Sequence, residues 1–251
     1  FGGAQEKGQI RSLTAEEFLG LQEAAEGRIR RITLAPEADE DFRLTRLCSG
    51  SGVSVSMGHS GADYEQVLLA AANGASCVTH VYNGMDRFHH RRPGLVGAAL
   101  GISDLYGEII CDGLHCHPAA LNLFFQAKGR HFGIMVTDSL SVKGCKPGAE
   151  GRLGEQAVVL GADGLARLKD STVIAGSTLA MNQGLKLLVE EAGVPFDAAL
   201  NACTLNPARY LGLEGRKGRI AAGCDGDLVL LGEDYQVLRV WRGGVEGEKD
   251  R

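Results

Sequence analysis

The sequence has no long apolar run and no long basic cluster. No stretch of its 251 residues approaches 18 consecutive apolar residues, which argues against a membrane-spanning helix. The formal net charge is -5, and Lys and Arg never gather beyond a few residues. Because binding along a nucleic acid requires many basic side chains to neutralise phosphates, that partner is not expected either. A small soluble metabolite is the expected partner.

Several familiar motifs are also absent. The seven cysteines never show the C-x-x-C spacing and mostly stand in apolar stretches, which indicates reduced, buried thiols in a cytoplasmic protein. No G-x-G-x-x-G, G-x-x-x-x-G-K-[ST] or G-x-S-x-G motif occurs, so a nucleotide-binding loop and a serine hydrolase elbow are not expected. Cys111 and Cys116 flank His115, but their apolar setting favours core thiols over a Cys–His pair.

Short β-favouring runs that end in polar residues alternate with helical patterns. Glycine, at 36 residues, is about twice as frequent as usual, which favours many tight turns between such elements. The predicted strands cover 28–37, 53–60, 76–83, 106–115 and 132–139. The predicted helices cover 14–25, 39–47, 62–72 and 118–128, with capping boxes at Thr14/Glu17 and Ser60/Asp63. This alternation predicts an α/β fold of parallel βαβ units.

The C-terminal part of the sequence differs from the rest. Helices are predicted at 178–191 and 196–202, with a continuation around 207–211. From Gly218 onward, short β-favouring runs and Gly/Asp turns replace the helical period. We therefore expect a domain boundary near residue 214, with a larger domain at 1–214 and a small β-module at 215–251.

Histidine is confined to the middle of the chain: all seven lie within 73 residues, and the last 120 residues have none. His59, His80, His115 and Asp138 each end a predicted strand, and active sites of parallel α/β barrels lie at that end of the strands. Imidazoles on adjacent strands can bind one divalent cation, and a carboxylate can take a proton from the water that it activates. The pattern predicts hydrolytic metal chemistry. The alternative for any single histidine is a hydrogen-bonded, half-buried side chain.

A polar, basic loop follows the second histidine strand and runs from Asn83 to Gly94. Its amide side chain, backbone N–H groups and guanidinium groups are typical of an anion site, especially for phosphate. The alternative is a solvated basic loop. The remaining histidines end no strand and are expected at the surface or in supporting positions: His89, His90, His117 and His131.

Several segments, in order, resemble one known family. They are GHSGA, THVYNGM, HHRRPGLVG, ICDGLHCHP, MVTDS, IAGSTLAM, LNPARYLGL and GRIAAGCDGDLV. They resemble the N-acetylglucosamine-6-phosphate deacetylases of the amidohydrolase superfamily, and the resemblance covers essentially the whole chain. It implies a metal-dependent (β/α)8 TIM-like barrel with a small β-sandwich, usually a homodimer. The implied reaction hydrolyses N-acetylglucosamine 6-phosphate to glucosamine 6-phosphate and acetate in amino-sugar catabolism.

The resemblance also implies roles for individual residues. His59 and His80 match the metal-binding histidines, and Asp138 matches the catalytic proton acceptor and donor. His115 matches a residue that contacts the substrate, and it is expected to help stabilise the oxyanion. The other implied substrate-binding residues are Asn83, Gly84, Arg91 for the phosphate, Asp112, Ile174, Ala175, Gly176, Ala4 and Gln5.

The sequence departs from the family pattern before Gly3. The third metal ligand of the family is a glutamate in an H-x-E-G-P strand, and this sequence begins with Phe1 after that point, without an initiator Met. We therefore expect a piece of a longer protein that holds barrel strands four to eight. Two imidazoles and a carboxylate accept zinc, iron, manganese or cobalt, and zinc is the expected metal.

Two alternative functions stay open. One keeps the enzyme but changes the substrate to N-acetylgalactosamine 6-phosphate or another N-acyl amine, because epimer choice depends on pocket shape. The other is an inactive sugar-phosphate-binding fragment, which the missing glutamate would explain.

Overall fold

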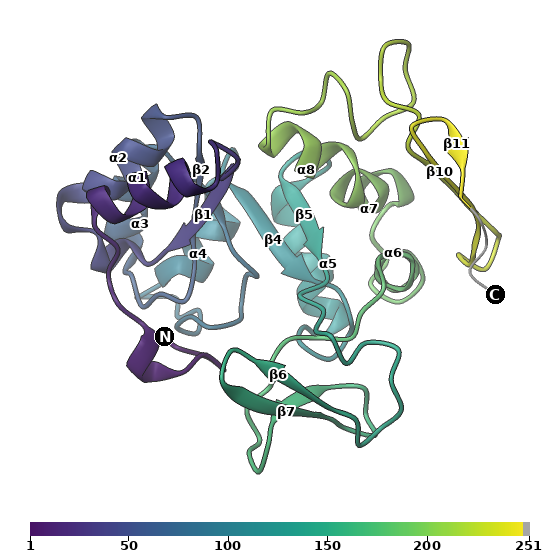
Figure 1. Cartoon of the computed structure of the whole chain (residues 1–251), viewed down its shortest axis with the longest axis horizontal. Helices are drawn as coiled ribbons and strands as arrows, with labels where there is room; N and C mark the ends of the chain where they lie inside the picture. The colour runs from purple at the N-terminus through teal and green to yellow at the C-terminus, as the bar shows by residue number, and fades with distance from the viewer. Residues whose placement is uncertain (248–251) are drawn as a thin grey trace.

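A five-stranded parallel sheet forms the centre of the structure, which is a computed structural model that describes residues 1–247. The strand order is β1-β2-β3-β4-β5, so each strand lies beside its neighbour in sequence (Figure 1). All five predicted strands are confirmed, and each is shorter than predicted because its polar ends leave the sheet. The strands are β1 (Arg31–Leu34), β2 (Ser54–Met57), β3 (Ala75–Val78), β4 (Tyr106–Ile110) and β5 (Gly133–Val136).

Helices connect the successive strands, as the predicted βαβ units require. The helix α1 (Ala15–Ala24) precedes β1, and one helix stands between each later pair of strands: α2 (Arg43–Gly50), α3 (Tyr64–Ala72), α4 (Gly94–Gly101) and α5 (Pro118–Lys128). Three more helices follow β5: α6 (Met181–Glu190), α7 (Phe196–Cys203) and α8 (Leu205–Tyr210). Short 3-10 turns are η1 (Lys7–Gln9), η2 (Pro36–Ala38) and η3 (Glu40–Phe42).

Capping residues fix where two of these helices begin. The capping box predicted at Thr14 and Glu17 is present before α1. Before α3, the box predicted at Ser60 and Asp63 is wrong, since Asp63 pairs instead with Gln66. The Ser60 hydroxyl donates to the Glu37 carboxylate at 2.6 Å, which keeps Ser60 in the preceding loop and delays the start of the helix.

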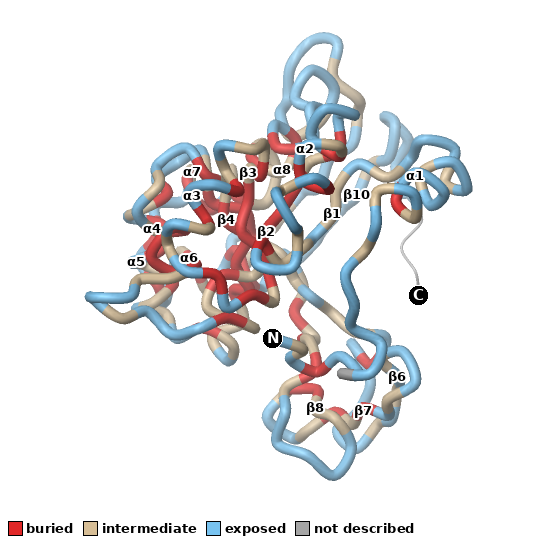
Figure 2. The backbone as a smooth tube through the Cα atoms, turned by 90° about the vertical axis from the view of Figure 1, so that its left-hand side faces the viewer, coloured by how far each residue is buried: buried red, intermediate tan, exposed pale blue. Residues whose placement is uncertain are grey.

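The hydrophobic core lies between the middle strands and their helices. Val55, Val78 and Ile109 from β2, β3 and β4 are completely buried and pack in one cluster with Leu121 and Phe124 of α5. Each fully buried aliphatic or aromatic side chain contributes about 1.5–3 kcal/mol. Figure 2 shows burial concentrated in β2, β3 and β4, whereas no residue of β1 is buried. The middle strands therefore supply most of the core of the sheet, and β1 is an edge strand.

Two parts of the fold were not predicted. The helix α4 has the sequence GLVGAALG, which is apolar on all sides and so shows no helical period, and five of its eight residues are buried. The strands β6 (Glu150–Leu153), β7 (Gln156–Leu160) and β8 (Ala166–Leu168) form an antiparallel sheet between β5 and α6. Gln156 donates to the carbonyl of Ala4 at 2.6 Å, so this sheet holds the first residues of the chain.

The C-terminal segment forms a second antiparallel sheet, as its sequence predicted. It consists of β9 (Leu228–Leu231), β10 (Val237–Arg242) and β11 (Val245–Glu246), in the order β11-β10-β9. Most of its side chains are exposed. Within residues 1–247, no helix combines the length and apolar character needed to cross a membrane.

Candidate active site

Three strand ends of the parallel sheet carry residues with an unusual backbone. His59 follows β2, His80 follows β3 and Asp138 follows β5, and their φ angles are 49°, 31° and 50°. A residue with a side chain in this left-handed region costs about 1–3 kcal/mol and persists only where its surroundings hold it. Such strain gathers at functional sites, so these three positions mark a candidate site that agrees with the sequence prediction.

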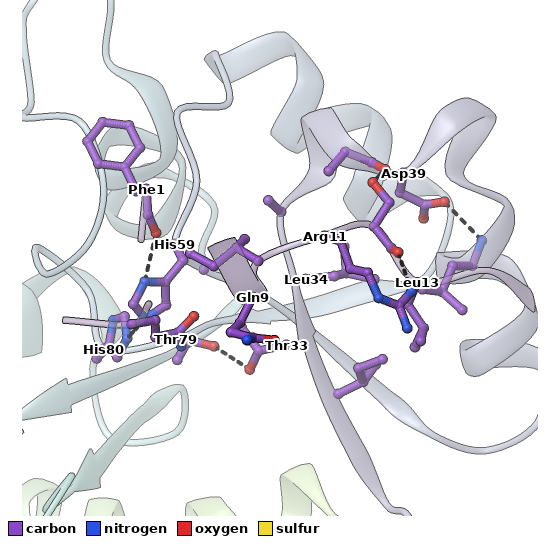
Figure 3. A pocket seen from close by; sticks show the side chains of 18 of the residues that line it. Phe1, Gln9, Arg11, Leu13, Thr33, Leu34, Asp39, His59, Thr79 and His80 are labelled. Carbon is purple, nitrogen blue, oxygen red and sulfur yellow. Dashed lines mark hydrogen bonds between the residues drawn. The ribbon is translucent and has the colours of Figure 1, made fainter. Parts of the chain in front are cut away.

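The two imidazoles face each other across this site (Figure 3). Nε2 of His80 lies 3.0 Å from Nε2 of His59. The Nδ1 atom of His59 lies 2.9 Å from the carbonyl oxygen of Phe1, which can only accept, so Nδ1 is the donor. In the neutral ring, Nε2 of His59 therefore keeps its lone pair. Burial, followed by the nearby His59, lowers the pKa of His80 and favours the neutral form of His80.

The positions of His59 and His80 suit two ligands of a single metal ion. Zn–N bonds of 2.0–2.1 Å place the two nitrogens of a tetrahedral site roughly 3.3 Å apart, and the observed separation is 3.0 Å. Metal-binding histidines usually donate their second ring N–H to a carbonyl or carboxylate, as His59 does to Phe1. Among residues 1–247, no cluster of three or more His, Cys, Asp or Glu side chains could hold a metal. The described residues thus offer a two-histidine site that is open to further ligands.

A cavity of about 220 Å³ lies beside the histidine pair. Ile110, Leu140 and Leu153 give it an apolar wall. Most of the predicted site residues line it, drawn from six separate parts of the chain: Ala4, Gln5, His59, His80, Asn83, Gly84, His115, Asp138, Ile174 and Gly176. A second cavity, of about 890 Å³, opens on the β1 side of the pair, and Asp138, Thr79 and Thr33 are among its lining residues (Figure 3).

Asp112 lies behind His115 and does not line either of these cavities. Its Oδ2 atom accepts a hydrogen bond from Nδ1 of His115 at 2.6 Å, and its Oδ1 atom accepts the backbone N–H groups of Leu114 and His115. Burial would raise the pKa of Asp112, but these hydrogen bonds outweigh it and lower the pKa. Asp112 therefore orients His115 and leaves Nε2 as the free ring nitrogen.

Two other predicted residues also lie away from the small cavity. Ala175 is completely buried and packs with Ala4 and Val158. Arg91 is exposed, and its guanidinium lies 3.0 Å from Nε2 of His90. The structure therefore does not bring the predicted phosphate-binding arginine to the histidine pair.

The sequence analysis missed Glu37, which holds the loop after His59. Its carboxylate accepts the hydroxyl of Ser60 at 2.6 Å and the backbone N–H of Gly61 at 2.7 Å. Glu37 ends the first predicted strand run. The rule that singled out polar residues at the other strand ends would have identified it.

The cysteines near the site behave as the sequence predicted. Cys111 and Cys116 are buried, and burial raises the pKa of both thiols, to about 11 for Cys116. Neither is therefore a ready nucleophile at neutral pH. Cys48 and Cys77 are buried as well, whereas Cys145 is exposed, contrary to the general expectation for these cysteines.

Similarity to known proteins covers nearly the whole chain. It is 41% identical over 244 residues to the N-acetylglucosamine-6-phosphate deacetylase of Bacillus subtilis (strain 168), covering 97% of this chain and 61% of the relative. It is 33% identical to the N-acetylgalactosamine-6-phosphate deacetylase of Escherichia coli O157:H7, covering 95% of this chain and 62% of the relative.

A solved structure is similar as well. It is an aspartate-to-alanine mutant of N-acetyl-D-glucosamine-6-phosphate deacetylase from Mycobacterium smegmatis in complex with N-acetyl-D-glucosamine-6-phosphate. It matches with a TM-score of 0.92 and 33% identity, covering 97% of this chain and 64% of that one. The chain thus spans about 60% of the length of the relatives it matches. Residues 4–246 match the amidohydrolase family, and the chain belongs to that family.

Proposed function

We propose that this chain carries the catalytic groups of a metal-dependent deacetylase that hydrolyses N-acetylglucosamine 6-phosphate to glucosamine 6-phosphate and acetate. One observation carries the proposal: the Nε2 atoms of His59 and His80 lie 3.0 Å apart, and Asp138 lines the cavity beside them. The similarity to deacetylases from Bacillus subtilis and Mycobacterium smegmatis supports the choice of substrate.

The proposal includes the arrangement of the whole protein. The five parallel strands would belong to a (β/α)8 TIM-like barrel, and β9, β10 and β11 to a small β-sandwich, with the domains divided near residue 214 into 1–214 and 215–251. The strand order and the likeness to solved deacetylases support the barrel. The homodimer and the cytoplasmic location stay predictions from the resemblance and the composition.

His59 and His80 would hold a divalent cation, and the third ligand would be the glutamate of the family's H-x-E-G-P strand. Zinc is the proposed metal, with iron, manganese and cobalt as alternatives. Such a cation polarises a carbonyl oxygen and lowers the pKa of a bound water from 15.7 to about 7. The lowered pKa of His80 favours the neutral imidazole that this role requires, and the contact of the His59 Nδ1 atom with the Phe1 carbonyl leaves the His59 Nε2 atom directed at His80.

Asp138 would move the proton. Its carboxylate takes a proton from water as the water oxygen forms a bond to the acetyl carbon. It then returns the proton to the sugar nitrogen as the C–N bond breaks, which leaves acetate and a free amine. His115 lines the same cavity, and its protonated ring would donate from Nε2 to the carbonyl oxygen of the substrate. The Asp112 carboxylate, bonded to Nδ1, would pair with that protonated ring.

The phosphate would bind near Asn83 and Gly84, which line the cavity. Binding a group remote from the reacting carbon supplies energy for orienting the substrate. Arg91 stays a proposed phosphate ligand. Its side chain is exposed and lies outside the cavity, so the support for this role is the family resemblance and not the geometry of this chain.

The test is acetate release from N-acetylglucosamine 6-phosphate, with and without added zinc. It compares this chain with a longer version that includes the H-x-E-G-P segment. Zinc-dependent release by the longer version supports the proposal, whereas no release by either version refutes it. Binding of the sugar phosphate without metal or turnover would instead favour a binding fragment.

A second substrate has support from one relative, the N-acetylgalactosamine-6-phosphate deacetylase of Escherichia coli O157:H7, at 33% identity. The two sugars differ only in the configuration at one carbon. Rates on the two epimers, measured with the same longer version, distinguish the functions. Faster release from the galactose epimer would change the substrate assignment and leave the reaction unchanged.

A further inference from the structure

A polar network inside the sheet centres on Thr79, the residue before His80. The Thr79 hydroxyl accepts from Nη2 of Arg31 at 2.9 Å and pairs with the hydroxyl of Ser56 at 2.7 Å. It also pairs with the hydroxyl of Thr33 at 3.0 Å (Figure 3). A hydroxyl has one proton and two lone pairs, so these partners satisfy it completely. Arg31 and Thr33 lie on β1 and Ser56 lies on β2, so the hydroxyl ties His80 to both strands.

The network extends to a third strand, β4, through an ion pair. Nη2 of Arg31 also donates to the Glu108 carboxylate on β4 at 2.7 Å, and Glu108 is only 7% exposed. Loss of Arg31 would leave the buried Glu108 carboxylate without its cationic partner, which is destabilising. The arginine is therefore held in place, and its second contact fixes the Thr79 hydroxyl.

The backbone on both sides of His80 is fixed to the same strands. The N–H of Thr79 donates to the carbonyl of Met57 on β2 at 2.8 Å, and the N–H of Val81 donates to the carbonyl of Glu108 on β4 at 2.7 Å. Between these two anchors, His80 has its left-handed φ of 31°. A strained residue keeps such a conformation only where several contacts determine it together.

We infer that Thr79 is a positioning residue for His80. Its hydroxyl, held by Arg31 and Ser56, keeps His80 in the left-handed conformation and so aims Nε2 of His80 at Nε2 of His59. The inference rests on the proposed function, because it takes these two histidines as the metal ligands. The competing role is a purely structural one, in which the network joins the strands without affecting the histidine.

The test compares two substitutions of Thr79, one without and one with a hydroxyl, and adds a control substitution elsewhere in the chain. Thr79→Val keeps the shape and removes the hydroxyl, whereas Thr79→Ser keeps the hydroxyl. Glu155→Gln removes an exposed ion pair with Arg152. Titration of Co²⁺ by calorimetry measures the affinity of each folded variant. We expect Thr79→Val to bind about 10–100-fold more weakly, as substitutions behind metal ligands do, and Thr79→Ser and Glu155→Gln to bind as the unmodified chain does.

A second measurement does not depend on metal. NMR signals of the His80 ring in the metal-free chain should shift in Thr79→Val and not in Thr79→Ser. Equal Co²⁺ affinity and unchanged His80 signals in folded Thr79→Val would overturn the inference. If Thr79→Val does not fold, Ser56→Ala, which removes one partner of the Thr79 hydroxyl without leaving a buried charge, should weaken Co²⁺ binding in the same direction, and unchanged affinity would overturn the inference.

Failure of the proposed function would look different. His80→Ala should abolish Co²⁺ binding at this site. If His80→Ala binds Co²⁺ as well as the unmodified chain does, the ligand assignment is wrong whatever Thr79 does. If His80→Ala loses binding and Thr79→Val keeps it, only the inference about Thr79 is wrong.

Discussion

The two histidine-bearing strand ends look alike and are held in different ways. Both histidines have a left-handed backbone, and their Nε2 atoms face each other. His80 is held from inside the sheet by Thr79 and by strands on either side. His59 is held from outside, by the Phe1 carbonyl on its ring and by Glu37 on the loop that follows it. One half of the site thus depends on the core, and the other half depends on loops.

The largest effect is expected for Asp138→Asn, which tests proton transfer separately from the positioning of the two histidines. Asp138→Asn removes the proposed proton acceptor and leaves both histidines and their contacts unchanged. We expect the rate of acetate release to fall by about a hundred- to ten-thousandfold, the usual contribution of general acid–base catalysis. Metal affinity should stay the same in calorimetry. A near-normal rate would show that Asp138 does not move the proton.

Glu37→Gln tests the loop side of the comparison. The substitution removes the charge that holds Ser60 and Gly61, so we expect about tenfold weaker metal binding through His59. The thermal midpoint should change little because Glu37 is exposed. Glu40→Gln, a nearby exposed carboxylate in η3, is the matched control. If both variants bind metal equally well, the loop does not position His59.

A matched pair of glycines tests contact with the His59 ring. Gly84 and Gly52 have φ angles of 61° and 73°, so alanine at either position costs roughly 1–2 kcal/mol. A Cβ on Gly84 would lie 3.1 Å from Nδ1 of His59, whereas one on Gly52 would meet no atom within 4 Å. We expect equal losses of stability in urea unfolding and a several-fold loss of metal affinity for Gly84→Ala alone. Equal metal affinities would mean that the ring has room to move.

Lys128→Met should change stability and leave the site untouched. Lys128 is buried, and its ammonium donates to the carbonyls of Ile102 and Leu105 at 2.6 and 2.7 Å. Removing this donor should cost about 1–3 kcal/mol of unfolding free energy at pH 7. Metal affinity should not change. A loss of metal affinity would show that general destabilisation is enough to disturb the histidines, and it would weaken the interpretation of the other variants.

The same residue predicts a pH dependence. Burial lowers the pKa of Lys128 from 10.5 to about 8. Between these values the unfolded chain holds a proton that the folded chain has lost, so this group makes stability rise with pH. The gain by pH 10.5 is at most roughly 3 kcal/mol. Urea unfolding from pH 7 to 10.5 should therefore show a growing difference between the unmodified chain and Lys128→Met, and a constant difference would contradict the pKa shift.

The sequence predicted the parts of the fold that depend on period and position. The predicted strand runs end in polar residues, and this pattern predicts that His59, His80 and Asp138 lie at one edge of the sheet. The period could not reveal α4, because GLVGAALG is apolar on every side. The period also could not reveal β6, β7 and β8. Charged residues, and in β6 a glycine, interrupt the alternation in β6 and β8, and β7 is a short run, QAVVL, without alternation.

The supporting residues of the site were harder to predict. Asp112 stood in a motif with His115, and only the structure reveals that it binds the histidine and does not line the cavity. Thr79, Arg31 and Glu108 are far apart in sequence, and each is an ordinary polar residue in a strand or directly after one. Their meeting depends on strand register, which a single sequence does not determine.

The left-handed strand ends have a consequence for evolving this protein toward heat resistance. His59, His80 and Asp138 each keep a conformation that glycine or asparagine adopts at lower cost. A selection that rewards only thermal survival would therefore favour replacing these residues, with a gain in stability of about 1–2 kcal/mol per position and loss of the proposed reaction. Directed evolution toward heat resistance therefore needs a selection for the proposed turnover at every round, because stability and that reaction make opposite demands on these three positions.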